Sequence, residues 1–472
     1  MISINTLPDD VLLSIFGQYV NDDAQDLTER ERAWQSLVHV CRRWRIIIFG
    51  SPRHLNLQLV CRERTPARDT LDVLPALPII IKCYGGYEIG SVDDITAVLE
   101  RSDRVCQIAL ANVPSPDFEI ILAEMQQPFP ELTDLFLSGL SSGGTVRVVP
   151  DSFLGRSAPR LKFLMLNSIP FPGLPKLLLS ATHLVDLHLD KIPHSGYITP
   201  NVMVTALSTL TILEHLTLEF QSPRSCPDQA NRRPPPSSRS VLPILTRFLF
   251  KGVAEYLEDL VARIDAPRLN SLRTIFFNDL AFNTPQFMQF ISRTPMPRLL
   301  EKAKITFQFG GAGLNFSSRT SDDGEIKVKT LCKGLDWQLS SLEQVHSSCL
   351  PPLSMLEDLY IYDHPKSKPG WKDDIENRLW LQLLHPFTTV KNVYLSEQIA
   401  LRIGPALQDL AEGRTTEMLP ALQNLFLEGL ESSGPVQEGI GTFVTARQVA
   451  SHPITVSSWA NSDRDKDYYY GV

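Results

Sequence analysis

The chain has few of the features that mark membrane, secreted or metal-binding proteins. Its 472 residues contain no apolar run near the ~18 residues that a membrane-spanning helix requires. The seven cysteines are scattered and form neither a Cys-x-x-Cys pair nor a metal-ligand spacing with histidine. Such a set is typical of reduced thiols, and the early acidic residues Asp9 and Asp10 do not fit a secretory signal peptide. We therefore expect a protein of the cytoplasm, the nucleus or both.

The chain also has no excess of positive charge. It contains 53 acidic and 45 basic residues, a net charge of −8. This balance argues against nucleic acid or an acidic membrane as a general partner. The local run Arg42, Arg43 and Arg45 is interpreted as the solvated face of a helix. A hydrophobic content of 43% suits a globular protein, and the length allows two or three domains, or a repeat array with one small module.

The N-terminal segment predicts two amphipathic helices. Leu7-Pro8-Asp9-Asp10 opens the first, because proline suits the first helical turn and the carboxylates favour the positive end of the helix dipole. An apolar face follows at helical spacing, formed by Val11, Leu12, Ile15 and Phe16. A second helix is predicted from about residue 29 to residue 48, with Leu37, Val40, Cys41, Trp44 and Ile48 on one face.

The paired segments Leu-Pro…Ile-Phe and Val-Cys-Arg-Arg-Trp resemble an F-box, over roughly residues 1–60. The resemblance implies a small helical module that binds a Skp-type adaptor and, through it, a cullin. It places the adaptor contacts on Leu7, Pro8, Val11, Leu12, Ile15 and Phe16, and it makes Val40, Cys41 and Trp44 core or contact residues. The alternative is an ordinary amphipathic helical cap on a repeat domain.

A strand-like pattern, apolar-x-x-apolar-x-apolar, recurs down the remaining chain. Clear copies begin at Val105, Leu132, Leu161, Leu184, Leu213, Leu245, Leu272, Leu356, Val390 and Leu422, with a weaker copy at Leu300. The usual step is close to the ~20–29 residues of a leucine-rich repeat. One long step suggests two repeats with a degenerate strand near Ile326-Val328. Helical stretches are predicted between strands at residues 118–125, 253–261, 285–291 and 375–384.

The repeats resemble irregular leucine-rich repeats, so the expected fold class is α/β. An all-helical N-terminal module would be followed by a curved solenoid, with strands on the concave side and helices on the convex side. The predicted domains are the module at 1–60, a connecting segment and solenoid cap at 61–100, repeats at 101–450 and a tail at 451–472. Loops are expected at about 221–240 and 310–325, which are rich in proline, serine or glycine. A two-domain α/β fold is the alternative.

The concave face of such a solenoid would carry the residue between the last two apolar positions of each strand. This rule selects Ala109, Phe136, Met165, His188, Thr217, Leu249, Phe276, Lys304, Tyr360, Tyr394 and Phe426. The last three are aromatic and come from consecutive strands, so we predict that Tyr360, Tyr394 and Phe426 bind substrate. Asp358, Asn392 and Asn424 lie two residues earlier and are candidates for hydrogen bonding. Alternatively, the aromatic side chains pack under neighbouring loops or the C-terminal tail.

Catalytic chemistry has little support. Gly139-Leu140-Ser141-Ser142-Gly143 matches the nucleophile elbow of hydrolases, but Gly144 and a strand-like segment follow where a helix is required. His183, His188, His194 and His215 cluster in sequence only. We therefore predict no catalytic residue, no metal site and no cofactor.

Together these patterns predict the substrate-recognition subunit of an SCF-type ubiquitin ligase. Its repeats would bind a protein target, and its N-terminal module would bind the Skp-type adaptor. The chain is similar to the divergent F-box sets of fungi, which say nothing about the target. The alternative function is a protein-binding repeat scaffold with no role in a ligase, and adaptor binding separates the two.

Overall fold

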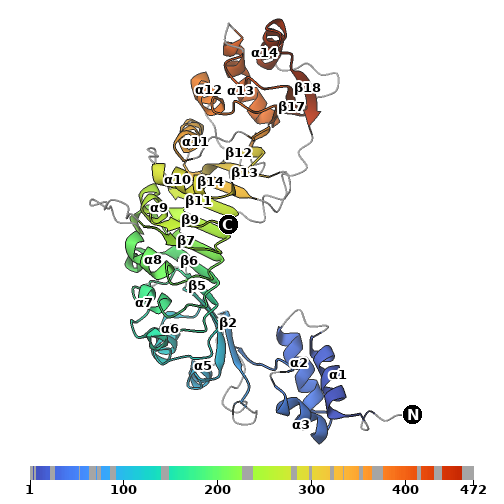
Figure 1. Ribbon diagram of the computed structural model, residues 1–472, viewed down its shortest axis with the longest axis vertical. Helices are drawn as coiled ribbons and strands as arrows, with labels where there is room; N and C mark the ends of the chain where they lie inside the picture. The colour runs from blue at the N-terminus through green and yellow to red at the C-terminus, as the bar shows by residue number, and fades with distance from the viewer. Residues whose placement is uncertain are drawn as a thin grey trace. The chain divides into compact units, whose positions relative to one another are not determined.

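The computed structural model describes residues 4, 7–21, 27–52, 54–62, 71, 76–84, 92–139, 148–225, 238–277, 284–296, 300–318, 324–332, 334–349, 355–363, 376–411, 416–429 and 438–459. In these ranges the chain forms a mixed α/β protein with 13 α-helices and a long, mostly parallel sheet of 16 strands (Figure 1). The predicted α/β class is confirmed. Contacts divide the chain into two units, Met1–Ile198 and Thr199–Val472, whereas the sequence suggested a first boundary at residue 60.

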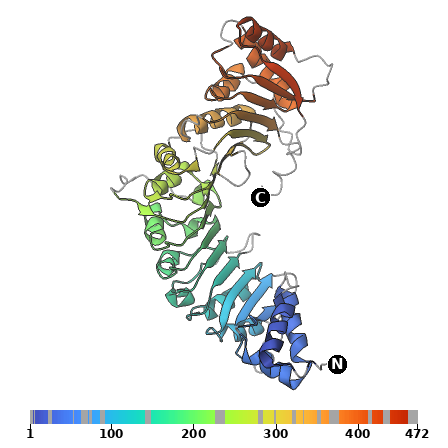
Figure 2. The same ribbon diagram turned by 45° about the vertical axis from the view of Figure 1, so that its right-hand side comes forward.

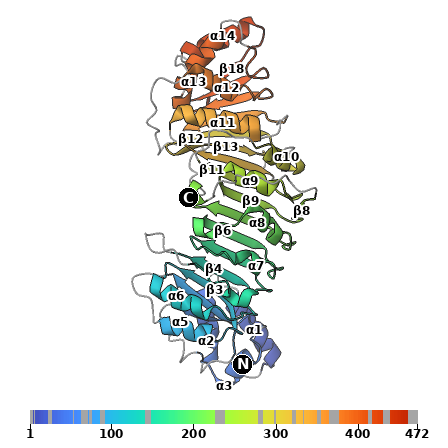
Figure 3. The ribbon, with the colours of Figure 1, turned by 90° about the vertical axis from the view of Figure 1, so that its left-hand side faces the viewer.

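The first unit begins with three helices and continues with parallel strands and their connecting helices. In chain order it contains α1 (Asp9–Asn21), α2 (Leu27–Val38), α3 (Arg42–Gly50), β1 (Leu59–Arg62), β2 (Ile79–Tyr84), α5 (Val92–Leu99), β3 (Val105–Ala111), α6 (Ser115–Glu124), β4 (Asp134–Ser138), β5 (Phe163–Asn167), α7 (Leu174–Leu178) and β6 (Asp186–Ile192). The strands pair in chain order, and α5, α6 and α7 lie on one side of them (Figure 3). The segment 61–100 therefore includes two strands of the sheet and a helix, where the sequence suggested a connecting segment and cap.

The single helix predicted from residue 29 to residue 48 is instead two helices, α2 and α3. Cys41 has extended backbone angles (φ −160°, ψ 169°), and the Arg45 Nε donates to the Val38 carbonyl at 3.1 Å, which stabilises the end of α2. A continuous helix would hold Trp34 and Ile48 roughly 21 Å apart. The break instead brings both side chains into one core, where they are 2% and 0% exposed.

The three N-terminal helices share one hydrophobic core. It contains Leu12, Phe16, Val20, Trp34, Leu37, Val38, Ile47 and Ile48, together with Leu55, Leu57 and Leu77 from the segments beside β1 and β2. The starts of α1 and α3 are joined by Arg43, which donates to the Asp9 carboxylate at 2.6 Å and to the Leu7 carbonyl at 2.6 Å. This core explains why the helices form a defined module next to the first strands.

The second unit repeats the strand–helix alternation. It contains α8 (Pro200–Leu207), β7 (His215–Phe220), β8 (Ser240–Val241), β9 (Arg247–Gly252), α9 (Ala254–Val261), β10 (Ile264–Asp265), β11 (Ser271–Phe277), α10 (Pro285–Arg293), β12 (Lys302–Gln308), β13 (Gly311–Ser317), β14 (Glu325–Leu331), α11 (Leu335–Cys349), β15 (Asp358–Asp363), α12 (Asn377–Leu384), β16 (Asn392–Leu395), α13 (Glu397–Leu410), β17 (Asn424–Glu428), α14 (Glu438–Val449) and β18 (Thr455–Trp459). Its helices lie over one face of its strands (Figure 3), and Figure 2 turns the strands toward the viewer. The four predicted helical stretches correspond to α6, α9, α10 and α12.

Apolar residues of neighbouring strands align in register on the helix side of the sheet. In the first unit Ile108 pairs with Leu135, which pairs with Leu164 on the next strand. These three side chains are at most 1% exposed. Since β3, β4 and β5 each contribute the same pair of apolar positions, the repeated sequence pattern produces a continuous buried row. Among the residues predicted to lie on the concave face, Phe276 is on the wrong side. It is 0% exposed and belongs to the buried row, so this prediction is wrong. Its neighbour Ile275 is partly buried and lies on the opposite face.

The prediction of a loop at 310–325 is wrong over Gly311–Ser317, and residues 319–323 lie outside the described residues. Gly311–Ser317 is β13, which pairs antiparallel with β12 and with β14. Ala312, Leu314 and Phe316 are buried, so the small residues between them belong to a strand of period two. Gly311 is required by close approach, because an added Cβ would lie 2.3 Å from the Thr330 carbonyl oxygen.

This antiparallel insertion also reverses the strand order. The sheet runs β11–β14–β13–β12–β15, so β14 lies next to β11 and β12 lies next to β15. The weak copy of the pattern at Leu300 leads into β12, which therefore does not lie next to β11, the preceding strand in the sequence. The predicted loop at 221–240 includes the short turn Pro223–Ser225, and residues 226–237 lie outside the described residues. The predicted tail at 451–472 includes a strand, β18, at the edge of the sheet. Residues 460–472 lie outside the described residues.

His346 on α11 makes the second unit sensitive to acid. Its ring packs against Phe316 and Phe387, with centroid distances of 6.3 Å and 4.9 Å. Burial lowers the pKa of His346 to about 4, from an ordinary value of 6.5. The unfolded chain therefore binds this proton more readily, so the stabilising effect is complete above pH 6.5 and is lost as the pH falls toward 4.

We expect the free energy of unfolding to fall by roughly 3 kcal/mol through this group between pH 6.5 and pH 4. The measurement is urea unfolding of the wild type and of His346→Phe across that range. The substitution is expected to flatten the pH dependence, whereas His385→Phe, at an exposed position, should leave it unchanged. Identical slopes for the wild type and His346→Phe would contradict this assignment.

Candidate protein-binding surfaces

Helix α1 has a second apolar face that the core does not cover. Leu12, Phe16 and Val20 point into the core, while Val11, Ile15 and Tyr19 are 39%, 40% and 54% exposed. The three exposed residues are four positions apart, so they form one row along the outside of the helix. We refer to Val11, Ile15 and Tyr19 as the α1 outer row. Pro8, which is also exposed, lies one turn before it.

The structure divides the nine residues predicted to meet an adaptor. Leu12 and Phe16 are 0% and 1% exposed, so they support the module from inside. Trp44 is partly buried and packs on Phe16 with a ring-centroid distance of 4.6 Å. Leu7 and Cys41 are also partly buried. The members at the surface are Pro8, Val11, Ile15 and Val40, the last of which is 58% exposed.

Sequence reasoning missed two exposed apolar residues of the helical module. Tyr19 continues the α1 outer row, and its four-residue spacing from Ile15 was a usable signal. Ile46 on α3 is 63% exposed. It lies in the run Ile46-Ile47-Ile48, in which the sequence alone does not show which isoleucine is outside. Exposed large apolar residues gathered on a small module are typical of a surface that binds another protein.

The three aromatic residues predicted to bind substrate are brought together by neighbouring strands. Tyr360 on β15 stacks on Tyr394 on β16 at 4.2 Å and 8° between planes. Tyr394 stacks on Phe426 on β17 at 4.4 Å and 7°. We call Tyr360, Tyr394 and Phe426 the aromatic row. Each ring is partly buried and alternates along its strand with buried apolar residues, so the three rings occupy the sheet face opposite the buried row.

Trp459 completes this surface and was missed because it falls in the predicted tail. Its ring lies 5.9 Å from Tyr360 and 5.6 Å from Tyr394, inclined at 58° and 66°. The rings of the row face one another, so their faces are occupied by each other. The surface therefore presents ring edges, which carry partial positive charge. This contact with Trp459 agrees with the alternative that the row packs under the C-terminal tail, of which residues 460–472 lie outside the described residues.

The polar residues beside the aromatic row bond to each other. The Asn392 amide donates to the Asp358 carboxylate at 2.7 Å, and the Asn424 amide donates to the Asn392 side-chain oxygen at 2.8 Å. Each bond joins adjacent strands at paired positions. These contacts fix the register of β15, β16 and β17, and with it the stacking of the rings.

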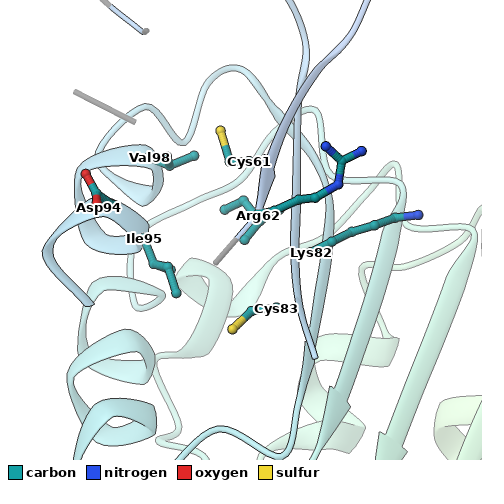
Figure 4. A pocket seen from close by; sticks show the side chains of 8 residues that line it. Cys61, Arg62, Lys82, Cys83, Asp94, Ile95 and Val98 are labelled. Atoms are coloured by element: carbon teal, nitrogen blue, oxygen red, sulfur yellow. The ribbon is translucent and has the colours of Figure 1, made fainter. Parts of the chain in front are cut away.

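An enclosed cavity in the first unit is too small for a substrate. Cys61, Arg62, Lys82, Cys83, Asp94, Ile95 and Val98 line it between β1, β2 and α5, as Figure 4 shows. Its volume of about 10 Å³ is no more than a single water molecule needs. Cys61 and Cys83 are buried free thiols.

Cys106 is a further free thiol, and it is partly buried. Its thiol donates to the Ile79 carbonyl at 3.3 Å, and burial, with the nearby Asp134 carboxylate, raises the pKa of Cys106 to about 11. At neutral pH it therefore stays protonated and unreactive.

The described residues contain neither a metal-binding cluster nor a membrane-spanning helix. There, no group of three or more His, Cys, Asp or Glu side chains is arranged to hold a metal ion, and no helix is long and apolar enough to span a bilayer. The segment 140–143 of the hydrolase-like motif lies outside these residues. His183 uses its Nδ1 in a 2.8 Å hydrogen bond with the Pro159 carbonyl.

Comparison with known proteins gives no family for this chain. No protein-family model matches the sequence, and no curated protein is significantly similar to it.

Proposed function

We propose that this chain is a substrate-recognition subunit of an SCF-type ubiquitin ligase. The helices α1, α2 and α3 would be an F-box that binds a Skp-type adaptor, and the strand–helix units would be irregular leucine-rich repeats that bind a protein target. The chain would contribute no catalytic residue. It would hold the target near a conjugating enzyme and so raise its effective concentration there.

The observation that carries this proposal is the α1 outer row. One apolar face of α1 lies in the core, and within the described residues the other, the α1 outer row, stays exposed. The sequence motif that resembles an F-box begins on this helix, and Pro8, Val11 and Ile15 of the motif are exposed. Each large side chain buried by a partner contributes roughly 1.5–3 kcal/mol, so a few anchors are sufficient for a specific interface.

The test is a calorimetric titration of the purified chain with a purified Skp-type adaptor. We expect saturable 1:1 binding (one adaptor per chain). Absence of binding by the folded wild-type chain would reject the ligase role and favour the alternative, a repeat scaffold.

The aromatic row supports the target-binding half of the proposal. Tyr360→Ala with Tyr394→Ala removes two stacked rings from the open sheet face, and we expect binding of target peptides to weaken about tenfold or more. Peptides selected on the wild-type chain from a display library provide the probes. Their affinity for the variant is measured by fluorescence anisotropy.

The matched control removes two aromatic rings elsewhere. Tyr84 and Phe309 are 54% and 62% exposed and are not in the row, so Tyr84→Ala with Phe309→Ala should retain binding. Circular dichroism melting shows whether each variant is folded. Equal affinity of a folded Tyr360/Tyr394 variant and the wild type would remove the row from the target site.

A further inference from the structure

The open sheet face of the second unit is basic over six strands, β7, β9, β11, β14, β13 and β12, although the chain as a whole has a net charge of −8. On β7, β9, β11, β14, β13 and β12, side chains alternate between the buried helix side and this face. The basic residues on the open face are Arg247, Lys251, Arg273, Lys302, Lys304, Lys327 and Lys329, and the acidic ones are Glu219 and Glu325. Local charge of this sign attracts an anionic partner in spite of the net charge.

Four of these cations lie on three adjacent strands. Lys251 on β9, Arg273 on β11, and Lys327 and Lys329 on β14 form what we call the cationic cluster. Arg273 pairs directly with Lys327, and Ile275 lies between Lys251 and Lys329 at the next position. Lys327 contacts the Glu325 carboxylate at 2.7 Å, and the Lys329 ammonium donates to the Gln308 side-chain oxygen at 3.1 Å.

Lys329 shows that the cluster is electrostatically unfavourable. Burial, followed by the positive charges of Lys251 and Arg273, lowers the pKa of Lys329 from its ordinary value. Like charges placed together in a partly buried site destabilise the fold unless a counter-charge arrives. An anionic ligand would remove this repulsion.

The cationic cluster and the aromatic row lie along one line of paired residues. Across the sheet the pairing runs Arg273–Lys327–Asn315–Lys304–Tyr360–Tyr394. All six are partly buried on the open face. Lys304 therefore connects the cations to the rings, whose exposed edges also favour negative charge.

We propose that this line binds an extended, acidic protein segment, with carboxylates over the cationic cluster and an apolar residue on the aromatic row. The proposal rests on the target-binding role suggested above and names the chemistry of the target. Charge complementarity selects this occupant, because the six strands present seven basic and two acidic side chains on this face, and the aromatic row presents ring edges.

The sheet geometry sets the spacing within the bound segment. Five strand steps separate β11 from β16. At about 4.8 Å per step this is roughly 24 Å, or about seven residues of extended chain. A segment with its acidic group and apolar residue that far apart reaches both parts of the surface.

The test is fluorescence anisotropy with a labelled peptide of four glutamates, a Gly/Ser spacer and a leucine about seven residues beyond them. We expect saturable binding by the wild type that weakens as salt is raised. Lys251→Glu with Lys329→Glu should weaken it at least tenfold. Lys162→Glu with Lys176→Glu is the matched control, since both are exposed in the first unit and the net charge changes equally.

Folding is monitored separately. Lys251→Gln with Lys329→Gln removes the repulsion, so this variant should melt at the same temperature as the wild type or higher, and still bind several-fold more weakly. Equal affinity of the wild type and a folded cluster variant would overturn the proposal, as would binding of a glutamine-substituted peptide with wild-type affinity. A requirement for phosphoserine in place of glutamate would also overturn it, because carboxylates would then be insufficient. No adaptor is present in this assay, so its failure is distinct from failure to bind the adaptor.

Discussion

Replacing both Val11 and Ile15 with aspartate is expected to weaken adaptor binding at least ~100-fold, which corresponds to about 2.7 kcal/mol. Both side chains are exposed on the α1 outer row, so the substitution removes apolar surface that a partner would bury and places two carboxylates in the same interface. Because neither residue belongs to the core, the free energy of unfolding should change little. Calorimetric titration with the adaptor gives the affinity, and circular dichroism melting gives the stability.

The control places aspartate on other helices at similarly exposed apolar positions. Ile120 on α6 and Val202 on α8 are 49% and 43% exposed, so Ile120→Asp with Val202→Asp should bind the adaptor as the wild type does. Leu12→Ala tests the inner face: it should destabilise the module by about 2–5 kcal/mol, because Leu12 is completely buried. If the Val11/Ile15 variant kept full affinity, the outer row would not be the docking surface.

Truncating Glu258 to alanine is expected to destabilise the second unit by about 2–4 kcal/mol. Glu258 on α9 is 6% exposed, and its two carboxylate oxygens accept the backbone N–H groups of Gln286 at 3.0 Å and Phe287 at 2.7 Å. These N–H groups belong to the first turn of α10, where a helix has no internal acceptors and its dipole favours negative charge. One side chain therefore caps the next helix and joins two neighbouring strand–helix units.

The effect is measured by urea unfolding and located by hydrogen exchange. The amides of Gln286 and Phe287 should exchange faster in Glu258→Ala. Glu258→Gln keeps the shape but loses the charge and should cost less than alanine. Glu417 is an exposed glutamate of the same unit, and Glu417→Gln should change stability by no more than about 0.5 kcal/mol. A change that small in Glu258→Ala would show that the cap does not stabilise the unit.

Both surfaces of the proposed receptor depend on residues that are buried beside them. Phe16 and Trp44 support α1 from inside, and the hydrogen bonds among Asp358, Asn392 and Asn424 hold the aromatic strands in register. Substitutions at these supporting residues should therefore reduce binding through loss of structure. Substitutions at Ile15 or Tyr394 should reduce it while the fold is retained.

The repeated apolar pattern was sufficient to predict the class of the fold and most of its strands. A position that recurs with the same spacing aligns on the next strand, so Leu135 predicts its contact with Leu164 without knowledge of the rest of the chain. The same reasoning placed Tyr360, Tyr394 and Phe426 together, because parallel strands in register bring equivalent positions side by side. The same reasoning failed at Phe276. The apolar spacing placed Phe276 on the open face, but the in–out alternation of β11 buries residues 272, 274 and 276.

What the sequence alone determined about this protein is the set of segments with repeating apolar positions, because burial on one face requires only a local period. The tertiary structure decided everything that depends on distant partners. It broke the second helix at Cys41 so that Trp34 and Ile48 could share a core, and it inserted β13 between β12 and β14. It also gathered Lys251, Arg273 and Lys329 into one cluster. Local periodicity cannot encode these outcomes, because each is set by the packing and pairing of residues that are far apart in the chain.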